Sequence, residues 1–75
     1  MIPPAGSPVW RKIATGQIAI PSSKLAVNLL VTNIRVRYSD DPSEANVQAL
    51  ARRAHQFFTQ YETVFPQEVQ AVLKN

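Results

Sequence analysis

One long amphipathic pattern in the second half of the chain limits the fold more than any other feature. At about 100° per residue, its apolar side chains fall on one arc of a helix, while glutamine, arginine and threonine fill the other side. The apolar set is Val47, Leu50, Ala54, Phe57, Phe58, Tyr61, Val64 and Phe65. We therefore predict a helix of roughly six turns over 42–64. Its apolar arc should form the core, with Phe57, Phe58 and Tyr61 mostly buried.

The acidic stretch from Ser39 to Asn46 precedes this pattern. Asp41 is followed by Pro42, and Glu44 comes three residues after Asp41. This order predicts Asp41 as the N-cap, Pro42 as the first helical residue and Glu44 as the N3 partner of a capping box. A calcium loop would need further oxygen ligands at set spacing, and that pattern is absent from the sequence. We therefore interpret these carboxylates as the start of a helix rather than as a metal or catalytic site.

Pro66 should end the long helix, because the residue before a proline avoids the helical region. A proline also suits the first position of a new helix, where its missing N–H would have no partner anyway. We therefore predict a last short helix that begins at Pro66, with Glu68 in its first turn. Its inward residues should be Val69, Val72 and Leu73.

The segment over 21–38 carries conflicting signals. Its β-branched residues favour a strand by propensity, but the spacing of one apolar set favours a helix. That set is Val27, Leu30, Val31, Ile34 and Tyr38. We predict a helix over 23–37, with Ser22 or Ser23 as its N-cap, and keep strand as the alternative.

The N-terminal part of the chain has weaker signals. Residues 1–9 contain Pro3, Pro4 and Pro8, and this arm should be extended and irregular because proline fixes φ and donates no hydrogen bond. Trp10 should end the arm by packing onto the core. For 12–21, with Gly16 in its middle, we predict coil or one short strand.

These elements predict an all-α fold, a small helical hairpin or bundle with an irregular proline-rich arm over 1–9. Residues 10–75 should form a single small domain, since the chain has only 75 residues. The alternative is an α+β fold with residues 10–38 in short strands. The longest apolar block is too short to span a membrane. The chain has no cysteine, so it has neither disulfides nor thiolate ligands, which suits a cytoplasmic protein.

Catalytic and cofactor-binding patterns are not evident in the sequence. His55 is the only histidine, and Glu62, seven residues later, could pair with it as an acid and a base. We interpret His55 instead as a solvent-facing residue at the border of the apolar arc. The two glycines do not have the spacing of a phosphate-binding loop. We therefore predict no enzymatic activity, no cofactor and no metal site.

A second apolar stripe on the predicted helix over 23–37 gives the main functional hypothesis. Leu25, Leu29 and Val36 lie apart from the first stripe, which predicts a helix that is covered on both sides. The cover could be the N-terminal segment or a second subunit. Only 17% of residues are charged, against about 25% in typical domains. We predict a non-enzymatic protein–protein interaction module, an adaptor, assembly factor or accessory subunit, that forms a dimer. We assign Leu25, Leu29, Val36 and Trp10 to the interface.

The uneven charge gives an alternative function. Residues 1–38 carry a net charge of +5, whereas the whole chain carries +3. A basic half suggests an acidic partner, and nucleic acid is the alternative that we keep. The candidate phosphate contacts are Arg11, Lys12, Arg35 and Arg37. Against this hypothesis, the sequence has no established nucleic-acid-binding motif.

Overall fold

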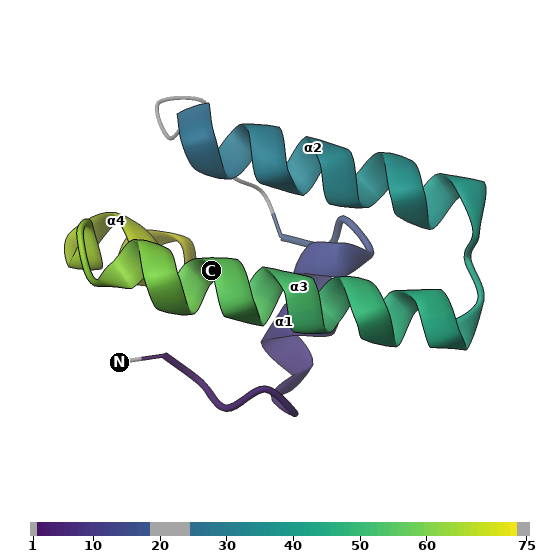
Figure 1. Cartoon of the computed structure of the whole chain (residues 1–75), viewed down its shortest axis with the longest axis horizontal. Coiled ribbons are helices and arrows are strands. Elements are labelled where there is room, and N and C mark those ends of the chain that lie inside the picture. Colours follow the sequence, from purple (N-terminus) through teal and green to yellow (C-terminus); the bar gives the residue numbers. More distant parts are fainter. Residues whose placement is uncertain (1, 19–24, 74–75) are drawn as a thin grey trace.

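The computed structural model describes residues 2–18 and 25–73, and this part of the chain forms four helices and no strand (Figure 1). The helices are α1 (Pro8–Ala14), α2 (Leu25–Asp40), α3 (Glu44–Glu62) and α4 (Pro66–Leu73). The predicted all-α fold is confirmed. The α+β alternative is wrong for the described residues, because most of the segment over 10–38 is helical.

Helix α3 is the centre of the arrangement, because each of the other three helices packs against it. Helices α2 and α3 run antiparallel and are joined by a short turn, whereas α1 lies across α3 and α4 folds back beside its C-terminal end (Figure 1). One core lies between them. The buried side chains in that core come from all four helices and from Ile18: Trp10, Ile13, Ala14, Ile18, Val27, Val31, Ile34, Leu50, Ala51, Ala54, Phe58, Val69 and Val72.

Helix α2 shows that spacing outweighs strand propensity in this segment. Val27, Val31 and Ile34 are fully or almost fully buried, and Leu30 and Tyr38 pack against the same core. Helix propensities differ by only tenths of a kcal/mol among these residue types, whereas burial of each large apolar side chain is worth about 1.5–3 kcal/mol. The helix runs to Asp40, three residues beyond the predicted end. The predicted cap at Ser22 or Ser23 lies outside the described residues.

Helix α1 corrects the prediction of coil or strand after Trp10. The helix begins with Pro8 at its first position and continues to Ala14, so the last two residues of the predicted arm are helical. The rest of the arm that the structure describes, over 2–7, is not helical. A helix of seven residues is marginal by itself, and α1 is stabilised by burial of Trp10, Ile13 and Ala14 between α2 and α3.

Gly16 ends α1. It adopts a φ of +78°, which a residue with a side chain rarely takes. Its N–H donates to the carbonyl of Ile13 at 3.3 Å, and the Gln17 N–H donates to the carbonyl of Lys12 at 2.8 Å. These two bonds form a Schellman motif, which satisfies the last free carbonyls of the helix. The motif turns the chain so that Ile18 enters the core.

The start of α3 corrects the predicted cap. Ser43, not Asp41, is the N-cap, and its hydroxyl accepts a hydrogen bond from the N–H of Asn46 at 3.3 Å. The Asp41 carboxylate instead accepts from the N–H of Ser43 at 3.2 Å, and so it holds the turn between α2 and α3. The physical reason is that α2 extends to Asp40, so Asp41 and Pro42 are needed for the turn. Glu44 becomes the first residue of α3 and does not close a capping box.

The end of α3 differs from the prediction in its burial. The helix stops at Glu62, and the Phe65 N–H donates to the carbonyl of Tyr61 as the chain turns. Val64 and Phe65 therefore leave the helical arc and are 66% and 44% exposed. Phe58 is fully buried, and Phe57 and Tyr61 are mostly buried and pack against the same core, as predicted. Helix α4 begins at Pro66 as predicted, with Val69 and Val72 buried and Leu73 half-buried.

The observed cap predicts the effect of removing one hydroxyl. Ser43→Ala should lower the free energy of unfolding by about 1 kcal/mol, and Ser43→Asp should restore most of it, because either oxygen can accept from Asn46. Ser39→Ala, an exposed position on α2, is the matched control and should change stability little. Urea unfolding followed by circular dichroism measures all three. An equal loss in Ser39→Ala and Ser43→Ala would contradict the cap.

The burial of the two adjacent phenylalanines predicts unequal costs of truncation. Phe58→Ala should lose about 3–5 kcal/mol, which is most of the stability that a chain of this size has. Phe57→Ala should lose clearly less, because its ring keeps contact with solvent. Thermal melts by circular dichroism compare the two. A variant Phe58→Ala that melts at the same temperature as Phe57→Ala would show that the core is assigned wrongly.

Candidate functional site

The outer side of α2 carries exposed apolar residues at the positions that the sequence singled out. Leu29 is 65% exposed and Val36 is 54% exposed. They are seven residues apart, which places them on the same side of the helix about 10 Å from each other. Thr32 and Asn33 lie between them and are also exposed. We call these four residues the outer face of α2. The backbone of Leu25 belongs to α2, but its side chain lies outside the described part of the structure.

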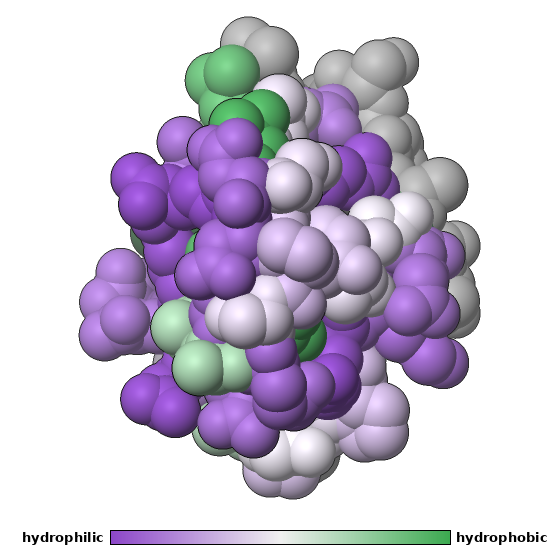
Figure 2. All heavy atoms as spheres, turned by 90° about the vertical axis from the view of Figure 1, so that its right-hand side faces the viewer, coloured by the Kyte–Doolittle hydropathy of each residue, from purple (hydrophilic) through white to green (hydrophobic). Residues whose placement is uncertain are grey.

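The opposite side of the same helix is part of the core. Val27, Val31 and Ile34 contact the cluster that contains Trp10, Ile13 and Ile18. The N-terminal segment therefore covers the inner side of α2, and Leu29 and Val36 stay open to solvent. Figure 2 looks onto the end of the molecule where α2 and α3 are joined. The surface there is mostly hydrophilic, and its most hydrophobic patch lies at the top, on the side of α2.

Trp10 lies in the core of the chain and not on the outer face of α2. Its side chain is fully buried, and its indole N–H donates to the carbonyl of Pro4 at 2.9 Å. The ring meets His55 edge-to-face at 5.2 Å and Phe58 at 5.7 Å. Its assignment to a partner interface is therefore replaced by a core position. The tryptophan anchors both the arm and α1 to α3.

His55 is half-buried, and its ring packs against Trp10 rather than pointing freely into solvent. Glu62, which the sequence suggested as its acid–base partner, accepts a hydrogen bond from the Gln70 amide at 2.9 Å. Within residues 2–18 and 25–73, no group of three histidine or acidic side chains is placed to hold a metal ion. The geometry thus gives His55 a packing role against α1.

Arg11 is joined to the start of α3. Its guanidinium donates to both carboxylate oxygens of Glu44, at 2.6 and 2.9 Å. The hydrogen bonds from Arg11, with a further one from Gln48, hold the pKa of Glu44 below its ordinary value. The same contact raises the pKa of Arg11. The pair is separated by 33 residues in the sequence, which is why no local pattern indicated it.

Arg35 has a structural role. Its guanidinium donates to the carbonyl of Ile18 at 2.8 Å, and its Nε is buried without a hydrogen-bond partner. A Cβ on Gly16 would lie 3.3 Å from that Nε, so the side chain packs directly on the turn after α1. Arg35 therefore ties α2 to the end of α1.

The other two predicted phosphate contacts lie on the surface. Lys12 is exposed on α1, and Arg37 is exposed on α2, where its Nε donates to Asn33 at 3.0 Å. Of the four predicted basic contacts, Arg11 and Arg35 are thus engaged with other parts of the chain.

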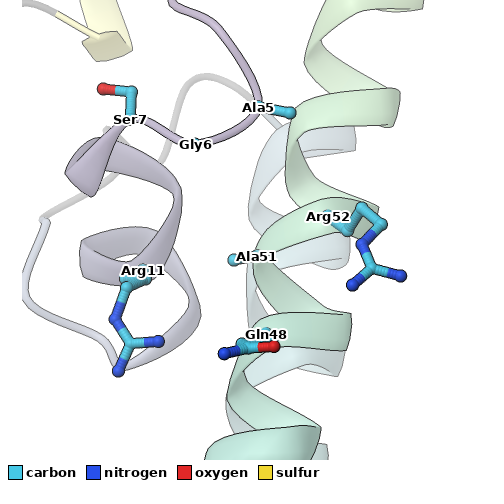
Figure 3. Close-up of a pocket in the computed structure, with 7 residues that line it drawn as sticks. All are labelled: Ala5, Gly6, Ser7, Arg11, Gln48, Ala51 and Arg52. Atoms are coloured by element: carbon cyan, nitrogen blue, oxygen red, sulfur yellow. The ribbon is translucent and has the colours of Figure 1, made fainter.

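A hollow of about 390 Å³ lies between the N-terminal arm and α3 (Figure 3). Its lining residues are Ala5, Gly6, Ser7, Arg11, Gln48, Ala51 and Arg52. In Figure 3 the side chains of Ser7 and Arg52 point away from this space, in opposite directions. Small-molecule sites use a few polar groups that converge on one ligand. The hollow lacks that convergence.

A row of aromatic rings follows the C-terminal half of α3. Phe57 stacks on Tyr61 with ring centroids 5.3 Å apart, and Tyr61 meets Phe65 at 4.9 Å. Burial and the nearby Glu68 carboxylate raise the pKa of Tyr61. Exposed Val64 and Phe65 make a second apolar patch at the turn before α4. The sequence pattern missed this patch because it assumed that the helix continues to 64.

Comparison with protein-family models, with curated proteins and with solved structures gave no match to this chain. Among the helices that the structure describes, none has both the length and the apolar character needed to cross a membrane. The candidate site is the outer face of α2, which is defined by the exposure of Leu29 and Val36.

The Arg11–Glu44 pair predicts a pH-dependent contribution to stability. The pKa of Glu44 is depressed in the folded chain, so its contribution is present above the unfolded pKa, about 4.3, and is lost as the pH falls through the folded value. Glu44→Gln should therefore melt slightly below the wild type at neutral pH, and the difference should vanish in acid. The effect should be small and salt-sensitive because both groups are exposed.

Arg11→Gln and the double variant complete a mutant cycle for this pair. Melting temperatures over an acid-to-neutral pH series should show coupling between the two positions only at neutral pH. A coupling that persists unchanged in acid would contradict the ionic origin of the contact.

Proposed function

We propose that this chain is a small non-enzymatic interaction module that binds another folded protein through the outer face of α2. The observation that carries the proposal is that Leu29 and Val36 are exposed on one side of a helix whose other side already fills the core. A single exposed leucine is ordinary in soluble proteins. Two large apolar residues in register, two turns apart, are the pattern of a helix that packs on both sides.

The expected affinity is moderate. Full burial of a leucine and a valine is worth about 1.5–3 kcal/mol each in transfer terms, and association costs offset much of that. A module of this kind, such as an adaptor or accessory subunit, would bind reversibly in the micromolar range. The lack of cysteine fits a role in the reducing cytoplasm.

Nucleic-acid binding has weaker support as a function. Two of the four candidate residues, Arg11 and Arg35, already donate to groups within the chain. A phosphate would have to compete with Glu44 for Arg11 and with the Ile18 carbonyl for Arg35. Lys12 and Arg37 alone give few phosphate contacts, whereas nucleic-acid affinity depends on many.

The test replaces Leu29 by a charge. Leu29→Glu should keep the helical circular dichroism signal but lose its associations, because a carboxylate at that position cannot be buried without a partner. Gln56→Glu, at an exposed position on α3, is the matched control and should keep them. Light scattering over a micromolar concentration series measures self-association, and quantitative mass spectrometry of proteins retained from a host extract measures other partners.

Each measurement is made at low and at high salt. Apolar association should change little, whereas phosphate binding falls steeply with salt. Identical behaviour of Leu29→Glu, Gln56→Glu and the wild type in both measurements would overturn the proposed function. Retention of nucleic acid that salt removes would favour the basic alternative.

A further inference from the structure

We infer that the turn between α3 and α4 is a second interaction site, which binds an exposed arginine side chain of a partner protein. The site is a hollow of about 300 Å³ lined by Val64, Phe65, Pro66, Gln67 and Glu68. We call these five residues the turn site. The inference goes beyond the proposed function, because the turn site shares no residue with the outer face of α2.

The turn site offers an aromatic ring to a ligand. Phe65 is 44% exposed and is the last ring of a row in which Phe57 stacks on Tyr61. Tyr61 covers one side of the Phe65 ring, with the centroids 4.9 Å apart, and the exposed remainder is open to a ligand. Arginine is the cation that pairs most often with such a ring, because its planar guanidinium stacks on it. Val64, 66% exposed, adds apolar surface for the methylene stem of the arginine.

The same hollow offers a carboxylate. Glu68 lines it together with Phe65, is partly buried and lies in the first turn of α4. Its Oε2 accepts a hydrogen bond from the Tyr61 hydroxyl at 3.3 Å, which holds the carboxylate beside the aromatic row. An ionised carboxylate has about four acceptor positions on its two oxygens. A guanidinium that stacks on Phe65 can therefore also donate to Glu68, and such a charge-assisted hydrogen bond is stronger than a neutral one.

The charge around the turn favours a cation over an anion. The sequence over 54–73 holds two glutamates, Glu62 and Glu68, and no lysine or arginine. The C-terminal end of α3 and the N-terminal end of α4 meet at this turn (Figure 1). Their dipoles place about half a charge of opposite sign there, so the two contributions largely offset one another. The two carboxylates therefore decide the sign, and the turn site is complementary to a basic side chain with an apolar stem.

Short peptides test this chemistry on the whole chain, with amide chemical shifts as the measurement. The probe is the capped tripeptide leucine–arginine–leucine. The matched probes replace arginine by citrulline, which keeps the planar group without its charge, or by glutamate. The arginine peptide should shift the amide signals of Val64, Phe65, Gln67 and Glu68 at millimolar concentration. The citrulline peptide should bind about twofold to fivefold more weakly, and the glutamate peptide should leave these signals in place.

Two variants assign the binding to its groups. Glu68→Gln keeps an acceptor for Tyr61 but removes the charge, and Phe65→Leu keeps an apolar side chain but removes the ring. Each should weaken binding of the arginine peptide about twofold to fivefold. Asp40→Asn removes an exposed carboxylate at the opposite end of the molecule, where α2 and α3 are joined, and is the matched control (Figure 1). Circular dichroism checks that each variant is folded.

The inference is supported if arginine binds more tightly than citrulline, and if both variants at the turn site weaken it while Asp40→Asn does not. Equal binding of the arginine and citrulline peptides would show an apolar contact without charge recognition and overturn it. Tighter binding of the glutamate peptide, or no shifts at the turn site, would also overturn it. None of these variants changes the outer face of α2, so a failure here is separate from a failure of the proposed function, which Leu29→Glu tests.

Discussion

Burial of Trp10 beneath α3 is the interaction on which the rest of this small structure depends. A helix as short as α1 cannot persist by itself, and the chain has no disulfide to hold it. The indole fills the space between the arm and α3, where it contacts His55 and Phe58 and donates to the Pro4 carbonyl. With α1 fixed in this way, Arg11 reaches Glu44 and Ile13 reaches the inner side of α2.

The position of α1 also determines which side of α2 is available. Because the residues around Trp10 and Ile18 occupy the inner side of α2, the apolar residues on its other side cannot enter the same core. Exposure of Leu29 and Val36 is thus a consequence of how the N-terminal segment packs. The same packing uses Arg35 to hold the turn after α1, which removes a cation from the surface. Both features support the proposal that α2 binds through an apolar contact rather than a basic one.

Much of the fold could be predicted from local patterns, and the errors share one cause. The helices α2, α3 and α4 were predicted because apolar periodicity and a proline at a helix start can be read from residues that are neighbours in the sequence. Errors arose at the helix ends, because the extent of one helix decides which residues are left to form the next turn. Asp41 has the local pattern of a cap, but α2 extends to Asp40 and Ser43 takes that role. Val64 and Phe65 continue the apolar spacing in the sequence, but α3 has ended before them and the chain turns toward α4 there.

The sequence by itself determined that the chain is helical, that its longest helix has one apolar side and that the helix before it has two. These properties follow from the helical repeat of 3.6 residues per turn in the spacing of apolar residues, which can be read without knowing what each helix packs against. Only the tertiary structure decided that residues 8–14 are helical and that Arg11 and Arg35 are held within the chain. Each of these depends on residues that are far apart in the sequence. Their contacts stabilise the fold only after α3 has brought the residues together, because ordering the chain between them costs conformational entropy.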